Sequence, residues 1–232
     1  MPARLLAIDT STELLSLGLA DGAGVRVHEE PGGAQASAVL LPRLLALLHD
    51  ARLRVADLDA IAFGRGPGAF TGLRTACSVA QGLALGADKP LLPVDTLLIV
   101  AECACELTGA TDVWAVQDAR MGEVYAARYR LETDGWRTVQ PPALYDPQTL
   151  EQRIAQAPAA VVAGNALPLH PALAGSATAV PQARPTAAAL LALAEAAWRR
   201  GEAVDAAQAL PLYIRDKVAF TTAEREAMRE AG

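Results

Sequence analysis

The chain has 232 residues and a formal net charge of −6, from 20 Lys and Arg against 26 Asp and Glu. This length predicts one large or two small folded domains. Hydrophobic residues make up 52% and charged residues 20%, a composition that excludes wholesale disorder. Because phosphate binding needs clustered positive charge, a chain this acidic with scattered basic residues is not expected to hold RNA alone.

Cysteine usage and hydropathy indicate the compartment. Cys77, Cys103 and Cys105 form no CxxC pair, so we predict neither a disulfide framework nor a structural zinc site. The apolar run 5–8 is too short for a signal-peptide core, and Asp9 interrupts it. No segment reaches the roughly 18 uninterrupted apolar residues of a membrane helix. We therefore expect a cytoplasmic protein without membrane contact.

The first hundred residues have an α/β pattern. Leu15, Leu17 and Leu19 alternate with small residues, which is typical of a strand. A Leu-rich stretch places its leucines on one helical face, and Pro42 is tolerable there only in a first turn. In chain order we expect strands at 4–8, 15–20, 25–28, 59–64 and 90–94, and helices at 37–51, 73–85 and 96–105.

The pattern then restarts. We expect strands at 113–116, 124–129, 136–139 and 160–163, and helices at 147–156 and 186–200. Asp9 and Asp118 hold equivalent places, because each follows an apolar strand and precedes a polar turn and a second strand. We interpret this as two similar α/β halves, a first domain at 1–104 and a second at 105–204. Residues 205–232 are expected to return to the first.

A polar turn follows the first strand. In Asp9-Thr10-Ser11-Thr12, a carboxylate beside hydroxyls and turn amides can hold hydrated magnesium and a phosphate. The same residues also form turns by bonding their own backbone, and turn chemistry alone favours that alternative. Asp9, Thr10, Ser11 and Asp118 are the candidate nucleotide or phosphate contacts.

Glycine is concentrated in one loop, GRGPGAFTGLR at residues 64–74. It matches neither the GxxxxGK[ST] nor the GxGxxG phosphate-binding pattern. Four glycines and a proline in nine residues exceed the needs of a tight turn, so we predict a functional loop, in which Thr71 could cap the helix that follows. Its candidate residues are Gly64, Gly66, Pro67, Gly68, Phe70, Thr71, Gly72 and Arg74.

The helix after this loop is rich in small residues, which allow a neighbouring element to pack closely. That neighbour is either the protein's own sheet or another subunit, and the sequence leaves both open. The candidate partner-interface residues are Leu41, Leu45, Ala76, Ala80 and Leu83. His28, His49 and His170 form no HxxxH pair, so no metal site is predicted, and no catalytic residue is assigned.

Four segments together resemble a known family. They are LLAIDTST (Leu5–Thr12), GRGPGAFTGLR (Gly64–Arg74), QDARMGEVYAA (Gln117–Ala127) and PLYIRDKVA (Pro211–Ala219). Their order and spacing resemble the TsaB (YeaZ) family of tRNA threonylcarbamoyladenosine biosynthesis proteins. The resemblance spans nearly the whole chain and is loose over 140–205.

This resemblance implies tandem actin/Hsp70-like domains of the ASKHA, ribonuclease H-like class. It implies a non-catalytic paralogue of TsaD, the enzyme that transfers a threonylcarbamoyl group to adenosine 37 of ANN-decoding tRNAs. The chain would bind TsaD through helices 37–51 and 72–86, or form a homodimer alone. The ATPase TsaE would join the assembly, and tRNA would be met only through the complex. No cofactor is implied, although ATP or ADP could sit at the complex interface.

One departure and two alternatives accompany the resemblance. Family members often carry a His where Gln35-Ala36-Ser37 stands here. The main alternative is a small ATPase or kinase of the same fold, using Asp9 and Asp118 around magnesium-nucleotide. A metalloprotease, from old labels on the wider family, is the weakest alternative because HxxxH is missing.

Overall fold

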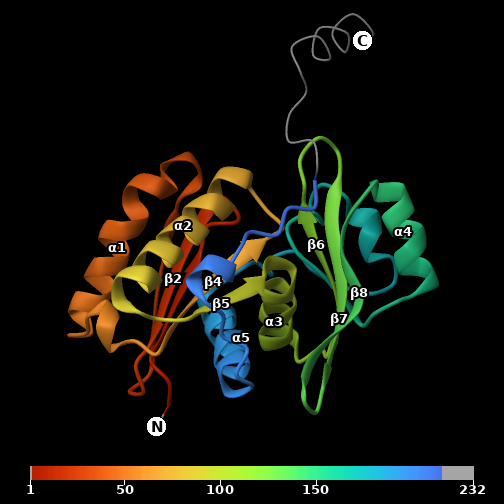
Figure 1. Ribbon diagram of the computed structural model, residues 1–232. Helices are drawn as coiled ribbons and strands as arrows, with labels where there is room; N and C mark the ends of the chain where they lie inside the picture. Colours follow the sequence, from red (N-terminus) through yellow and green to blue (C-terminus); the bar gives the residue numbers. More distant parts are fainter. Residues whose placement is uncertain (1, 216–232) are drawn as a thin grey trace, which may run out of the picture.

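The computed structural model describes residues 2–215 and contains two five-stranded sheets. The first has the strand order β3-β2-β1-β4-β5 and the second β10-β9-β6-β7-β8 (Figure 1). The strands are β1 (Leu5–Asp9), β2 (Leu14–Ala20), β3 (Val25–Pro31), β4 (Ala60–Gly66), β5 (Leu91–Asp95), β6 (Asp112–Asp118), β7 (Val124–Glu132), β8 (Gly135–Tyr145), β9 (Val161–Ala163) and β10 (Thr178–Val180).

Both sheets have one topology. In each, three strands form an antiparallel meander, and two later strands join parallel to the first. Read from β8 to β10, the second order repeats the first, and Asp9 and Asp118 end the equivalent strands β1 and β6. The predicted duplication and the actin-like, ribonuclease H-like fold are thereby confirmed.

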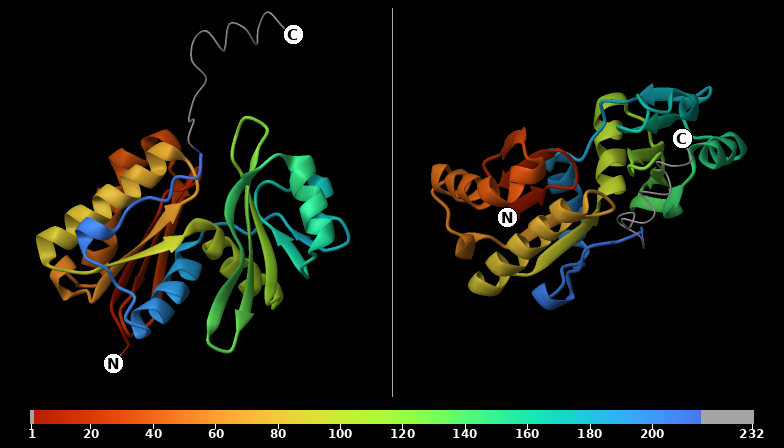
Figure 2. Two further views of the ribbon diagram at one scale, coloured as in Figure 1. Left: turned by 45° about the vertical axis from the view of Figure 1, so that its right-hand side comes forward. Right: turned by 90° about the horizontal axis from the view of Figure 1, so that it is seen from above.

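The helices form three layers around these sheets. They are α1 (Ala36–Asp50), α2 (Phe70–Ala87), α3 (Thr96–Thr108), α4 (Pro147–Gln156) and α5 (Ala187–Arg199), with 3-10 turns η1 (Gly33–Gln35), η2 (Val55–Asp57), η3 (Pro171–Ala174) and η4 (Ala206–Gln208). Helices α1 and α2 cover the outer face of the first sheet and α4 that of the second. Helices α3 and α5 lie between the sheets in a shared apolar core, as the turned views of Figure 2 also show.

Local chemistry sets several helix ends. The Asp146 carboxylate accepts hydrogen bonds from two backbone amides of the first turn of α4, and Pro147 takes the first helical position. The Thr186 hydroxyl accepts from Ala189 N at the start of α5. The expectation for Pro42 was wrong: it lies in the second turn of α1, which continues through it because the buried face of α1 packs on β2.

Helix α5 follows the second sheet in sequence but packs on the first. Ser16 Oγ on β2 accepts a hydrogen bond of 2.8 Å from Ala187 N, and Gly18 leaves the space that Leu191 and Ala187 fill. The assignment of residues 105–204 to a second domain is therefore corrected for this helix. Its apolar face covers the first sheet.

The chain then runs back along the first half. Leu91 and Val204 exchange backbone hydrogen bonds, Gln81 Nε2 donates to Ala206 O and Ala209 O, and Leu212 N donates to Arg65 O. The rest of the predicted return, 216–232, lies outside the described residues. Within residues 2–215, no helix is long and apolar enough to span a membrane.

Candidate functional site

Asp9 lies at the end of β1 and is 1% exposed. Its Oδ1 accepts hydrogen bonds from Ser11 N (3.0 Å) and Ser11 Oγ (2.7 Å). Its Oδ2 is buried without a partner among the described residues, against Gly64, where any Cβ would overlap it. Burial raises the pKa of Asp9 to about 6, although the hydrogen bonds from Ser11 lower it.

The glycine-rich loop closes over this turn. Ala69 N donates to Ser11 O at 2.8 Å, and Thr10 Oγ1 donates to Gly72 O at 2.7 Å. A Cβ at Gly68 would lie 2.6 Å from Ser11 O, and one at Gly72 would overlap the Thr10 carbonyl. Glycine is thus required here for close approach to the chain's own turn.

The packing of the glycine-rich loop on the Asp9 turn determines how accessible the candidate phosphate-binding residues are. Asp9, Thr10 and Ser11 are brought together, but each is at most 2% exposed, so the loop covers them. Asp118 makes contacts of its own: its Oδ1 accepts from Arg120 N, its N–H donates to Asn165 Oδ1, and the Arg120 guanidinium pairs with both Asp118 and Glu13. Within residues 2–215, none of its hydrogen bonds reaches the Asp9 turn. In the part of the chain that the structure describes, this arrangement buries the Asp9 carboxyl together with the hydroxyls of Thr10 and Ser11.

The end of the loop differs from expectation. Helix α2 begins at Phe70, three residues earlier than predicted, and its N-cap is Ala69. The cap prediction for Thr71 was therefore wrong, because Thr71 lies inside the first turn. Gly72 also lies within the helix, since its missing Cβ admits Thr10 O.

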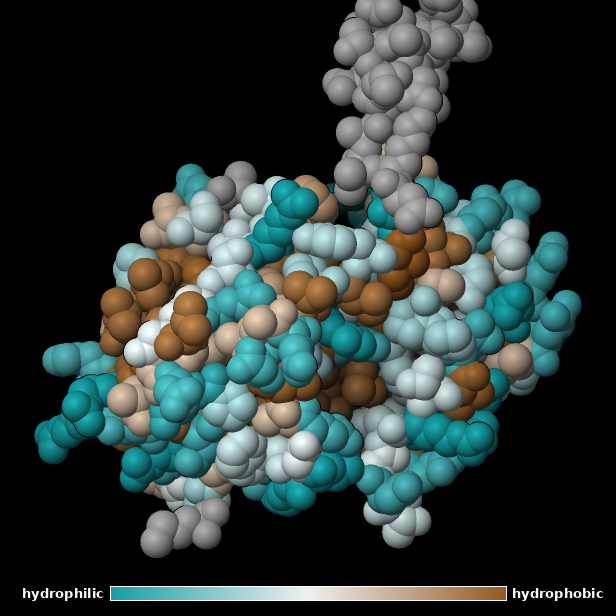
Figure 3. Space-filling model, viewed as in Figure 1, coloured by the Kyte–Doolittle hydropathy of each residue, from teal (hydrophilic) through white to brown (hydrophobic). Residues whose placement is uncertain are grey.

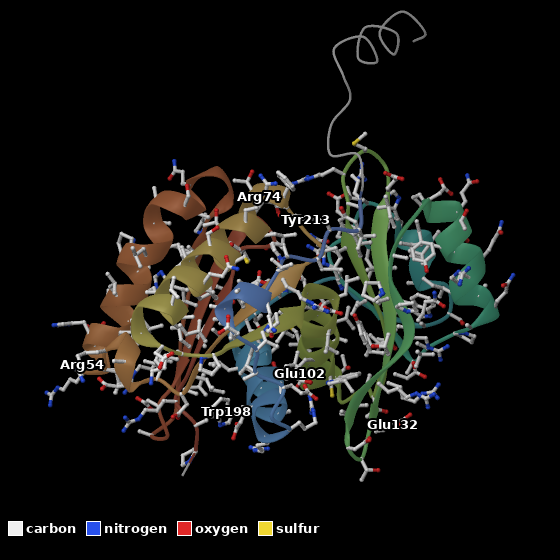
Figure 4. All side chains as sticks on the ribbon, in the orientation of Figure 1. Arg54, Arg74, Glu102, Glu132, Trp198 and Tyr213 are labelled. Atoms are coloured by element: carbon white, nitrogen blue, oxygen red, sulfur yellow. The ribbon has the colours of Figure 1, made fainter. Side chains whose placement is uncertain are left out.

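An exposed cluster joins this end of α2 to the returning chain. The Arg74 guanidinium carbon lies 3.9 Å from the Phe70 ring centroid, and Arg74 Nε donates to Tyr213 Oη at 3.2 Å. The Phe70 and Tyr213 rings are 5.3 Å apart. Figure 4 labels Arg74 and Tyr213 at the upper edge of the molecule. Tyr213 was not among the predicted site residues, although it belongs to the PLYIRDKVA segment.

Two predicted interface residues are not on the surface. Ala76 and Ala80 are fully buried and pack in the core between α2 and the first sheet, so their placement in a partner interface is corrected. The small side chains let α2 approach β4 closely. The sequence did not distinguish this face from the outer one, because both faces of α2 carry small residues.

The outer face carries leucines instead. Leu41 is 42% exposed and Leu45 48% on α1, Leu83 is half-buried on α2, and Leu85 is 81% exposed. Leu83 packs against the core, and we call the other three residues, Leu41, Leu45 and Leu85, the leucine face. In Figure 3, hydrophobic side chains gather over α1 and α2 at the left of the molecule. Leu85 was missed, and its i+2 spacing from Leu83 is the signal that places it on a different side of α2.

Metal and thiol chemistry have little support in this part of the chain. Within residues 2–215, no group of three or more His, Cys, Asp or Glu side chains is arranged to hold a metal ion. The three cysteines are free thiols, and burial raises the pKa of each.

Comparison with known proteins places this geometry in a family. A family model described as TsaD: tRNA N6-adenosine threonylcarbamoyltransferase matches residues 24–222. The tRNA threonylcarbamoyladenosine biosynthesis protein TsaB of Escherichia coli (strain K12) is 36% identical over 94% of this chain and 96% of its own length. TsaB of Haemophilus influenzae is 33% identical over 93% and 95%.

A solved structure agrees. YeaZ from Pseudomonas aeruginosa is 40% identical to this chain and superposes with a TM-score of 0.83, covering 91% of this chain and 99% of that one. The quoted motifs, the duplicated sheets and these likenesses over nearly the whole length agree, and the chain belongs to the TsaB (YeaZ) family, within the broader group that the TsaD-type domain defines.

Proposed function

We propose that this chain is a non-catalytic partner subunit in the synthesis of threonylcarbamoyladenosine on tRNA. It would support a TsaD-type subunit that transfers the threonylcarbamoyl group to adenosine 37 of ANN-decoding tRNAs. Family membership supports a role in this biosynthesis. The observation that carries the partner role is the leucine face of α1 and α2.

The leucine face has the character of an interface. Leu41 and Leu45 are one turn apart on α1, and α2 packs beside α1. Around Leu85, the exposed residues Ser78, Gly82 and Gly86 are small, so a partner helix could approach α2 closely. Grouped exposed leucines mark interaction surfaces more often than singly scattered ones. We assign the TsaD-type subunit to this face.

The buried Asp9 turn supports a role without catalysis by this chain. An ATPase or kinase would need Asp9, Thr10 and Ser11 open to magnesium-nucleotide, and the glycine-rich loop covers all three. The proposal therefore requires no cofactor on this chain. ATP or ADP would bind, if anywhere, at the interface of the complex.

The other partners follow from the same proposal. A TsaE-type ATPase would join the assembly in the cytoplasm. tRNA would be held only through the complex, since the chain's net charge of −6 opposes phosphate binding. In the absence of the TsaD-type subunit, the same leucine face would pair two copies of this chain.

The test is a mixing experiment with the TsaD-type subunit, using size exclusion with light scattering. Wild type should form a stable complex, whereas Leu45→Arg should not, because it places a charge in an apolar interface. Leu169→Arg is the matched control, because Leu169 is 60% exposed on the second half of the chain. It should bind as wild type does.

Activity completes the test. With the adenylate-forming enzyme, a TsaE-type ATPase, ATP and tRNA supplied, modification should require this chain and fail with Leu45→Arg. No complex, or modification without this chain, would overturn the proposal. ATP turnover by the chain alone that disappears in Asp9→Ala would favour the ATPase alternative instead.

A further inference from the structure

A cavity of about 390 Å³ opens between the two halves of the molecule, and its lining does not include the Asp9 turn. It is bounded by α3, α5 and the β7–β8 hairpin, and Figure 3 shows a hollow with hydrophobic walls in this part of the surface. Its volume is in the range of small-molecule sites, about 300–1,000 Å³, which occur preferentially where domains meet.

One part of the cavity wall is apolar, and its residues come from α3, α5 and the β7–β8 hairpin. Leu98 of α3 and Leu193 of α5 face Leu131 and Trp136 from the β7–β8 hairpin. Ala196, on the next turn of α5, is small and leaves the space open. A ligand seated here would therefore bury an aliphatic or aromatic body against groups from both halves.

The charges that line the cavity are not balanced. Arg65 Nε donates to Asp95 Oδ1 at 2.6 Å, and Arg200 makes a bidentate pair with Glu202 at 2.6 and 2.9 Å. Glu102, half-buried on α3 and labelled in Figure 4, accepts a hydrogen bond from Trp136 Nε1. Among the described residues it has no basic partner. One carboxylate beside an indole ring thus remains uncompensated.

From these observations we propose that the cavity binds a small organic cation, an ammonium group carried on a short apolar body. The ammonium pairs with the Glu102 carboxylate and lies against the Trp136 ring, where ion pairing and cation–π attraction act together. The apolar body packs between Leu98 and Leu193. The site is independent of the leucine face and of the proposed partner role.

The experiment compares three probes with one body and different charge: phenethylamine, 2-phenylethanol and 3-phenylpropionate. Each is titrated into the full chain by calorimetry, with tryptophan fluorescence as a second readout. We expect the amine to bind about five- to tenfold more tightly than the alcohol, and the acid not to bind, because the pair is only partly desolvated. Equal binding of amine and alcohol, or no binding of the amine to folded protein, would overturn the proposal.

Variants locate the site. Glu102→Gln should abolish the preference for the amine over the alcohol. Glu106→Gln, the same change one turn further along α3 and outside the cavity lining, should keep it. Ala196→Leu, which fills the cavity, should reduce binding of both probes, and thermal melting checks that each variant is folded. A Glu102→Gln variant that still prefers the amine would disprove the assignment.

Discussion

At the scale of single residues, the carboxyl of Asp9 ties stability to pH. Its pKa is raised to about 6 by burial, so the folded state takes up a proton below pH 6 and the unfolded chain only near its ordinary value of 3.8. Keeping Asp9 ionised in the fold costs about 3 kcal/mol at neutral pH. The cost falls away as the pH drops from about 6 toward 4.

We therefore predict that Asp9→Asn changes the pH dependence of stability. An amide keeps the acceptor for Ser11 and never ionises, so the free energy of unfolding of the variant should exceed that of wild type at pH 7.5 and approach it at pH 5. Urea unfolding at pH 7.5, 6 and 5 measures the difference, and subtracting the two proteins removes other titrating groups. Parallel profiles would show that Asp9 does not carry the effect.

Two glycines of one helix should respond oppositely to the same substitution. Gly72→Ala places a methyl group into the Thr10 carbonyl and should lower the free energy of unfolding by about 1–3 kcal/mol. Gly82→Ala meets open space on the same helix and should raise it by about 0.5–1 kcal/mol. The midpoints of denaturant unfolding of both variants measure these changes. A Gly72→Ala variant as stable as wild type would show that the glycine-rich loop does not pack closely on the Asp9 turn.

At the scale of elements, α2 has two faces that its sequence does not distinguish. Ala80→Arg puts an unpaired charge into the core and should cost about 3–5 kcal/mol of stability. Leu85→Arg lies on the outer face and should change stability by less than about 0.5 kcal/mol. Thermal melts of both variants test this, and a stable, folded Ala80→Arg would contradict the buried placement.

The same helix shows how far sequence reasoning reaches. Strands β1 and β2 and the helix at 147–156 were predicted closely, because alternation, turn residues and an Asp-Pro start are local signals. Strand β3 was predicted to end at His28, three residues before its end at Pro31. The start of α2 at Phe70 was missed, because Gly72 is typical of a loop and its reason lies at Thr10, which is distant in sequence. The covering of Asp9 by the loop was missed for the same reason.

At the scale of the whole molecule, the duplication was predictable and the packing of α5 was not. Hydrophobic periodicity shows that a helix has an apolar face, but not which sheet that face covers. Helix α5 follows the second sheet and packs on the first, while α3 follows the first sheet and contacts β6 and β7 of the second. The two halves are thus interlocked by the helices that lie between them (Figure 2).

This interlocking predicts that the halves unfold together. Trp114, Trp136 and Trp198 lie on β6, β8 and α5, so fluorescence reports on the second sheet and on α5, whereas far-UV circular dichroism also reports on α1 and α2. In urea, the two signals should follow one coincident transition.

The variant Gly18→Val tests the same prediction of joint unfolding by disturbing the contact between β2 and α5. A Cβ at position 18 would lie 2.8 Å from Leu191 Cδ1 and 3.0 Å from the Ala187 Cβ. The substitution presses α5 away from β2 and should lower the free energy of unfolding by about 1–3 kcal/mol. Because α5 joins the second sheet to the first, both signals should shift to the same lower midpoint. Two separate transitions, or a dichroism midpoint that moves while the fluorescence midpoint stays, would show that each half is stable without the other.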